Sequence, residues 1–125
     1  MVKGIVRPDE AVRAAEAGAD GVAVSNHCGC QLDTSPPTIE VLPEVVDALA
    51  AGGHRIEVLL DGCIRRGTDI LKALALGARA VLVGRAILSR LAFDGEAGAA
   101  WILRVLRDEL DPAVERAAVG RPAGA

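Results

Sequence analysis

The stretch Ile56–Asp69, IEVLLDGCIRRGTD, determines how the rest of the chain is interpreted. Its apolar run Val58–Leu60 is short and unbroken, which is typical of a parallel strand covered on both faces. Asp61 and Gly62 follow directly, and both residue types favour turns. The stretch therefore predicts a buried strand that ends abruptly at a turn.

A helix and then another strand are predicted after this turn. Thr68 or Asp69 is suited to cap the helix, and the next strand covers residues 80–83. Arg65 then follows one strand and Gly84-Arg85 follows the next, so both arginines should reach the same rim of a parallel sheet. Helix starts offer free N–H groups, glycine lets an anion approach the backbone, and arginine binds phosphate in a bidentate manner. The pattern predicts a phosphate site.

Composition narrows the classes of function. The chain has 125 residues, of which 51% are hydrophobic, so it fits one domain with a real core. A net charge of -3 and an aromatic content of 2% argue against nucleic-acid binding. No apolar run approaches the roughly 20 residues that cross a bilayer, and residues 1–4 do not resemble a signal peptide. The odd number of cysteines, three, suits a reducing compartment, and we expect a cytoplasmic protein.

Strands and helices alternate along the first two thirds of the chain, which predicts an α/β fold. Only helices are predicted beyond residue 88, with boundaries at Asp94-Gly95 and at Asp111-Pro112. We expect residues 1–120 to form one domain and residues 121–125 to be a disordered tail. The four predicted strands cover residues 4–6, 21–25, 58–60 and 80–83. Thr38 is suited to cap the helix after the second strand, and Trp101 is expected to face inward from a later helix. The buried apolar stripe of the helix after Thr38 is expected at Ile39, Val41, Leu42, Val45, Val46 and Leu49.

Seven short segments carry a resemblance to a known family. They are KGI at 3–5, VSNH at 24–27, QLD at 31–33, DG at 61–62, IRRGTD at 64–69, KALALGA at 72–78 and VGR at 83–85. In order and spacing they resemble the FMN-dependent α-hydroxy-acid oxidases and dehydrogenases, which include glycolate oxidase, lactate oxidase and flavin-dependent lactate dehydrogenases. The resemblance covers only the C-terminal part of such proteins. It implies half of a (β/α)₈ TIM barrel, since such barrels typically need about 250 residues.

The resemblance also implies a cofactor, FMN, and a role for several residues. Lys3 would face the N1/O2 edge of the flavin, and Ser25 would lie against the ring. His27 would be the catalytic base and would also contact the substrate, a small 2-hydroxy acid. The implied contacts to the ribityl chain and phosphate are Asp61, Gly62, Arg65, Gly84 and Arg85.

Two positions depart from the family pattern. Where the family usually has His-Gly-Gly-Arg-Gln, this chain has Cys28 and Cys30 in place of the second and fourth residues. The arginine expected at position 30 would hold the substrate carboxylate, and a thiol replaces neither its charge nor its two-pronged geometry. Cys63 stands at the second glycine of the Asp-Gly-Gly turn, which brings a Cβ atom close to the cofactor. The acid that would orient His27 is expected from strands that this sequence does not contain.

The residues leave other interpretations open. His27 with the three cysteines could form a metal cluster, although a Cys-x-Cys pair is a weak signal beside the two-residue spacing of zinc sites. His54, in a Gly-Gly-His loop, is expected to be exposed and structural. Three functions remain. The first is FMN-dependent oxidation of a small L-2-hydroxy acid to the 2-oxo acid, in which this chain is a truncated and inactive member. The others are a non-catalytic half-barrel that binds FMN or phosphate, and a thiol or metal module.

The predicted half-barrel also indicates that the chain associates with another chain. Its first and last strands would be unpaired, and unpaired strand edges favour association. We expect self-association, or pairing with a missing N-terminal half.

Overall fold

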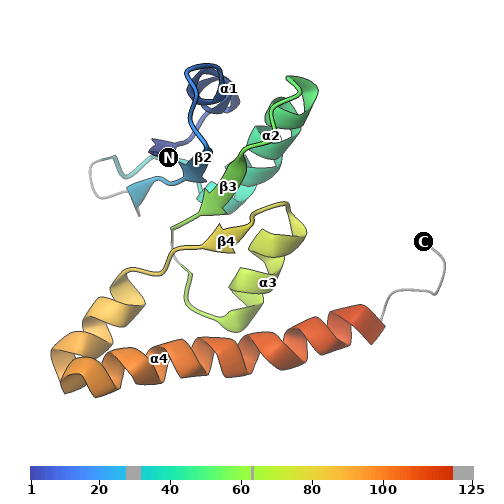
Figure 1. The fold of residues 1–125 in the computed structure, drawn as a ribbon. Coiled ribbons are helices and arrows are strands. Elements are labelled where there is room, and N and C mark those ends of the chain that lie inside the picture. The colour runs from blue at the N-terminus through green and yellow to red at the C-terminus, as the bar shows by residue number, and fades with distance from the viewer. Residues whose placement is uncertain (28–31, 63, 120–125) are drawn as a thin grey trace. The chain divides into compact units, whose positions relative to one another are not determined.

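The computed structural model describes residues 1–27, 32–62 and 64–119 (Figure 1). These residues form two compact units. The first contains the described residues up to Gly62 together with residues 73–82, and the second contains residues 64–72 and the described residues from Val83 onward. Helix α3 (Gly67–Ala75) begins in the second unit and ends in the first.

Four parallel strands form a single sheet in the first unit, in the order β1-β2-β3-β4. Val22 on β2 pairs with Val2 on β1 and with Val58 on β3, and Leu60 on β3 pairs with Val81 on β4. This alternation of strands with helices confirms the predicted α/β class. The strands are β1 (Val2–Ile5), β2 (Gly21–Val24), β3 (Glu57–Leu60) and β4 (Ala80–Val81), so β4 is shorter than predicted.

Burial differs between the two central strands. All four residues of β2 are buried, as expected for a parallel strand covered on both faces. On β3, by contrast, Val58 and Leu60 are buried while Leu59 is only half-buried. Successive side chains of a strand point to opposite faces, so one face of β3 is better covered than the other. The predicted cover on both faces is therefore confirmed for one face of β3 and only in part for the other.

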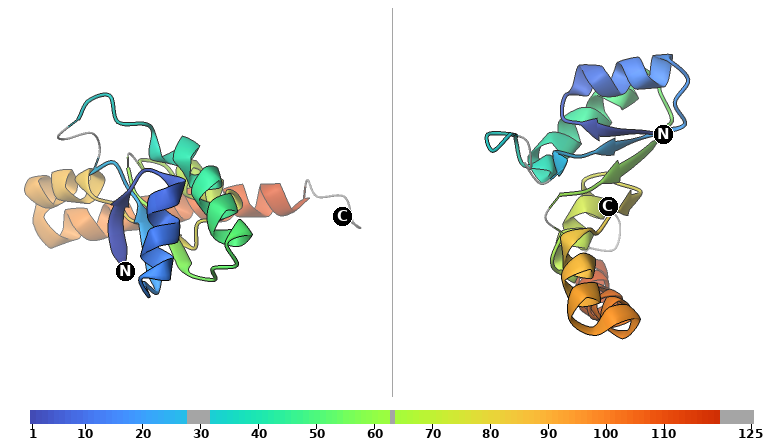
Figure 2. Two further views of the ribbon diagram at one scale, coloured as in Figure 1. Left: turned by 90° about the horizontal axis from the view of Figure 1, so that it is seen from above. Right: turned by 90° about the vertical axis from the view of Figure 1, so that its left-hand side faces the viewer.

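Helices α1 (Pro8–Glu16) and α2 (Thr38–Ala51) lie side by side against this sheet (Figure 2). The predicted apolar stripe of α2 is confirmed at four positions, which are buried together with the side chains of β2 and with Leu60. These α2 residues are Val41, Leu42, Val45 and Leu49. Hydrophobic burial of this kind stabilises a fold by roughly 25 cal/mol per Å² of apolar surface.

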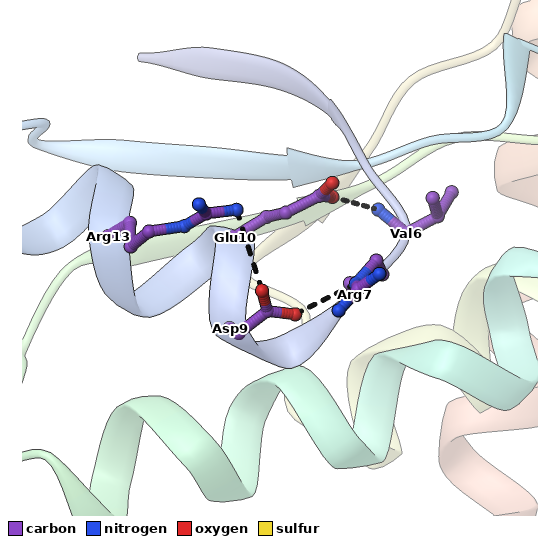
Figure 3. A network of polar contacts seen from close by, with 5 residues as sticks. All are labelled: Val6, Arg7, Asp9, Glu10 and Arg13. Carbon is purple, nitrogen blue, oxygen red and sulfur yellow. Dashed lines mark hydrogen bonds and ion pairs between the residues drawn. The ribbon is translucent and has the colours of Figure 1, made fainter.

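Charged side chains organise the start of α1 (Figure 3). Asp9 accepts a hydrogen bond from Arg7 Nε at 2.9 Å and forms an ion pair with Arg13 at 3.4 Å. Glu10 reaches back and accepts a hydrogen bond from the backbone N–H of Val6 at 3.4 Å. The hydrogen bond from Arg7 lowers the pKa of Asp9, and the same hydrogen bond raises the pKa of Arg7. Acidic residues in a first turn also complement the helix dipole.

In the second unit the main element is α4 (Arg85–Val119), which is interrupted at Asp94 and Gly95. This interruption confirms the predicted break. The helix continues through Pro112, however, so the boundary predicted at Asp111-Pro112 is wrong. Trp101, expected to face inward, is 43% exposed, with the guanidinium carbon of Arg90 4.3 Å from the ring centroid. None of the described helices has both the length and the apolarity to span a membrane.

Candidate cofactor site

Lys3 lies at an irregular point of β1. Lys3 pairs with Ala23 and Ile5 pairs with Val24, so Gly4 is an extra residue that forms a bulge. The φ angle of Gly4 is 98°, which glycine adopts readily because it has no Cβ atom. Bulges re-aim neighbouring side chains. A glycine inside a predicted strand was the sequence signal for this bulge.

The side chain of Lys3 joins the ends of two other strands. Its Nζ atom donates a hydrogen bond to Ser25 Oγ at 2.9 Å and lies 2.7 Å from Asp61 Oδ2. Ser25 follows β2 directly, and Asp61 follows β3 directly. The ammonium group of Lys3, which comes from within β1, thus meets a hydroxyl group and a carboxylate at the carboxyl ends of β2 and β3. In open parallel sheets this is the edge at which ligands bind.

Ser25 links this group to His27. The Ser25 side chain is buried, and its Oγ atom accepts hydrogen bonds from Lys3 Nζ and, at 3.2 Å, from the backbone N–H of His27. His27 is exposed and has a φ angle of 49°, a left-handed conformation that costs a residue with a side chain about 1–2 kcal/mol. Strained residues of this kind cluster at functional sites. Among the described residues, no carboxylate forms an ion pair with His27.

Asp61 has one oxygen atom without a partner among the described residues. While Oδ2 contacts Lys3, Oδ1 is buried and accepts no hydrogen bond from the described part of the chain. Leaving a buried acceptor unsatisfied costs about 1–3 kcal/mol. A ligand with hydroxyl donors would satisfy this atom, and a ligand acceptor would fit beside the ammonium group of Lys3.

The turn after Asp61 is held by a contact that sequence reasoning missed. Thr38, at the start of α2, donates a hydrogen bond from Oγ1 to the carbonyl oxygen of Asp61 at 2.5 Å. We expected Thr38 to cap α2, but the cap position is Pro37 and no side chain caps the helix. Gly62 has a φ angle of 104°, and a Cβ atom there would lie 2.7 Å from Thr38 Oγ1. Nothing in the local sequence signals a contact across 23 residues.

The second unit contains the arginines of the predicted phosphate site. Arg65 and Arg85 are both exposed. Gly84 precedes α4, and its carbonyl oxygen accepts hydrogen bonds from the N–H groups of Ile87 and Leu88. A Cβ atom on Gly84 would meet no atom of the described residues within 4 Å, which leaves room for a ligand beside the backbone there.

The start of α3 does not match the expectation of free N–H groups. The backbone N–H groups of Arg65 and Arg66 donate to Asp69 Oδ2, and that of Gly67 donates to Glu109 Oε2 at 2.8 Å. Because α3 begins at Gly67, Thr68 and Asp69 lie inside its first turn and neither is the N-cap residue. Asp69 nevertheless satisfies donors at the helix start, whereas Thr68 is exposed. Carboxylates already occupy these donors, so an anion has no place at this helix start.

The cysteine-based interpretation falls outside the described residues, because Cys28, Cys30 and Cys63 all lie there. Within residues 1–27, 32–62 and 64–119, no group of three His, Cys, Asp or Glu side chains could hold a metal ion. His54 is half-buried rather than exposed, and it lines a surface hollow with Val46, Leu49 and Arg79.

Comparisons with known proteins place these features in context. A family model described as FMN-dependent dehydrogenase matches residues 1–123. The chain is 54% identical over 109 residues to 2-hydroxyacid oxidase 1 of Mus musculus, covering 87% of this chain and 29% of the relative. It is 52% identical over 114 residues to L-lactate oxidase of a Nostoc species, covering 91% and 30%. Pre-mycofactocin synthase of Mycobacterium tuberculosis is also 52% identical over 114 residues, covering 91% and 28%.

Solved structures give the same result. The crystal structure of mandelate oxidase with benzoyl-formic acid matches with a TM-score of 0.84 and 50% sequence identity, covering 91% of this chain and 33% of that chain. A mandelate oxidase variant with a monooxide FMN adduct matches equally well and covers 36% of that chain. The chain therefore spans about 30% of the length of the curated relatives it matches.

Proposed function

Because this chain belongs to the FMN-dependent dehydrogenase family, we propose that it carries the FMN-binding part of an enzyme that oxidises a small L-2-hydroxy acid to the 2-oxo acid. Membership of this family confirms the resemblance found in the sequence, and FMN is the cofactor of the family. One observation carries the proposal. The buried Oδ1 atom of Asp61, which has no partner in the described part of the chain, lies on the same carboxylate that contacts Lys3, directly after β3.

The described residues fit FMN in this respect. The ribityl chain offers hydroxyl donors for Asp61 Oδ1, and Lys3 supplies the positive charge for the N1/O2 edge of the flavin. Ser25 would lie against the ring, and its hydroxyl accepts a hydrogen bond from the backbone N–H of His27. Gly62 keeps the turn free of a Cβ atom beside the ribityl chain, while Cys63 follows it. Arg65 and Arg85 bind the phosphate, and Gly84 leaves the backbone accessible to it.

His27 removes a proton from the hydroxy acid. When bound, FMN accepts the two electrons that leave the substrate. The left-handed backbone of His27 and the hydrogen bond from its N–H group to Ser25 support a fixed main chain at this residue. Position 30 contacts the substrate carboxylate in this proposal, and Cys30 binds it more weakly than the arginine that it replaces.

The isolated chain is inactive in this proposal for two separable reasons. Loss of the arginine at position 30 removes a charge-assisted contact worth roughly 1.5–3 kcal/mol. The acid that orients His27, together with further flavin contacts, comes from residues outside this sequence. A non-catalytic module that binds FMN is the second candidate function, and the cysteine at position 30 favours it.

The experiment combines the two repairs. Cys30→Arg alone gives no turnover, and the N-terminal part of a family relative supplied alone gives little. The two together give measurable flavin reduction by an α-hydroxy acid under anaerobic conditions, and His27→Ala abolishes it. Turnover by the unmodified chain alone would contradict the two-defect account, and activity that survives His27→Ala would remove the base assignment.

The substrate class is the least constrained part of the proposal. Relatives at nearly equal identity include 2-hydroxyacid oxidases, an L-lactate oxidase and a pre-mycofactocin synthase. A panel of lactate, glycolate and mandelate tests the class in the reconstituted protein. We further propose a cytoplasmic location, supported by the odd number of cysteines.

A further inference from the structure

Three consecutive backbone N–H groups at the start of α3 are held by two carboxylates. Arg65 N and Arg66 N donate to the same oxygen, Asp69 Oδ2, at 3.1 and 3.0 Å. Gly67 N donates to Glu109 Oε2 at 2.8 Å. Each backbone N–H group from Arg65 to Gly67, where α3 begins, is thus held by a hydrogen bond to a carboxylate.

The two carboxylates act over different distances in sequence. Asp69 lies in the first turn of α3 and reaches back to the residues before the helix, as the acidic member of a capping box does. Glu109 lies on α4, 42 residues from Gly67. Gly67 is buried, and a Cβ atom on it would lie 2.3 Å from the backbone nitrogen of Leu110, so only glycine allows this close approach.

This arrangement determines how an anion can bind near Arg65. The N–H groups are already used by carboxylates, so they are not available to a phosphate. Recognition must therefore come from the guanidinium group, which is exposed on a main chain that cannot shift freely. A side chain held on a fixed backbone loses less entropy when it binds.

We propose that Asp69 and Glu109 are positioning residues, which hold the turn Arg65–Gly67 so that Arg65 recognises the phosphate of FMN. The inference rests on the proposed FMN binding and deepens it. Neither carboxylate touches the cofactor in this account. Each acts through the backbone of the turn, so each should affect the phosphate end of the ligand only.

Riboflavin, which lacks the phosphate, separates positioning from general folding. Asp69→Ala and Glu109→Ala in the full chain should raise the dissociation constant for FMN about tenfold, which corresponds to one charged hydrogen bond. The dissociation constant for riboflavin should stay within about twofold, because riboflavin makes no contact with Arg65. Asp69→Asn keeps an acceptor oxygen and should restore most of the FMN affinity.

Asp111→Asn is the matched control, since it removes a negative charge from an exposed position on the same helix as Glu109. It should leave both dissociation constants unchanged. Equal losses of FMN and riboflavin affinity in the alanine variants, or no loss of either, would overturn the positioning role. If the unmodified chain bound neither ligand, the proposed function itself would fail, and this inference would fail with it.

Discussion

The Nζ atom of Lys3 lies 2.7 Å from Oδ2 of Asp61, so an ion pair connects β1 to the residue that follows β3, across β2. The Asp61 side chain is only 16% exposed, whereas that of Lys3 is 45% exposed. One carboxylate oxygen is thus neutralised by the lysine, and the other is buried without a partner in the described chain. A ligand with hydroxyl groups would donate a hydrogen bond to this second oxygen.

Asp61→Asn tests the ribityl contact. The substitution removes the charge that Lys3 faces and weakens the acceptor, so the dissociation constants for FMN and riboflavin should both rise by about tenfold. Both ligands are affected because both contain the ribityl chain. Loss of a phosphate-binding arginine should instead weaken the binding of FMN only. Fluorescence titration measures both constants. Unchanged binding of both ligands would contradict the ribityl contact of Asp61.

Gly62→Ala tests the turn beside Asp61. The added Cβ atom meets Thr38 Oγ1 at 2.7 Å, and the φ angle of 104° disfavours any side chain. We expect a loss of about 1–3 kcal/mol in the free energy of unfolding, measured by urea denaturation. The matched control is Gly53→Ala, whose φ angle is also positive at 71° but whose Cβ atom would meet nothing within 4 Å.

The difference between these two variants isolates the steric contact from the backbone strain. Gly62→Ala should therefore destabilise the protein more than Gly53→Ala, and in a Thr38→Ala background the excess should shrink. Equal effects of the two glycine substitutions would show that the contact with Thr38 does not matter.

The pKa of Asp9, lowered by Arg7, predicts a pH dependence for the start of α1. An acid with a depressed pKa in the folded state stabilises the protein fully above its unfolded pKa, about 3.9, and loses this contribution as the pH falls through the folded pKa. Asp9→Asn should therefore lower the thermal midpoint slightly at pH 7. The difference from the unmodified chain should vanish at acidic pH below the folded pKa. The group is exposed, so the effect is small. A difference that persists at low pH would assign it to another cause.

Association is expected from the surface that the described chain leaves exposed. β1 and β4 are the outer strands of the sheet, and their free edges can pair with another chain. Apolar side chains on α4 are also exposed, with Leu88 at 61% and Phe93 at 82%. Sedimentation velocity at micromolar concentration should show dimers or larger species. A folded monomer that does not associate would contradict this prediction.

Local patterns in the sequence predicted the elements well, because apolar spacing and turn residues are local signals. The buried stripe of α2 and the break at Asp94-Gly95 follow from such patterns. The continuation of α4 through Pro112 was missed, since a proline usually marks a boundary but is tolerated at the cost of one backbone hydrogen bond. The exposure of Trp101 was missed because helical spacing does not reveal that Arg90 stacks on its ring.

The sequence predicted the residues of the site better than it predicted the contacts between them. The resemblance pointed to Lys3, Ser25 and Asp61, which the structure brings together. Two contacts had no sequence signal, the hydrogen bond from Thr38 to Asp61 and that from Gly67 to Glu109, because each joins residues far apart in the chain. The roles of Cys30 and Cys63 stay predictions, as both lie outside the described residues.

The central claim is that this chain recognises FMN through its phosphate, and equilibrium titration of FMN fluorescence tests it most directly. We predict saturable quenching by the unmodified chain, with the dissociation constant raised about tenfold or more by Arg65→Ala and by Arg85→Ala. Arg55→Ala, which removes an exposed arginine from the turn before β3, should leave the titration unchanged. A titration that neither Arg65→Ala nor Arg85→Ala alters, or that Arg55→Ala weakens equally, would contradict the account.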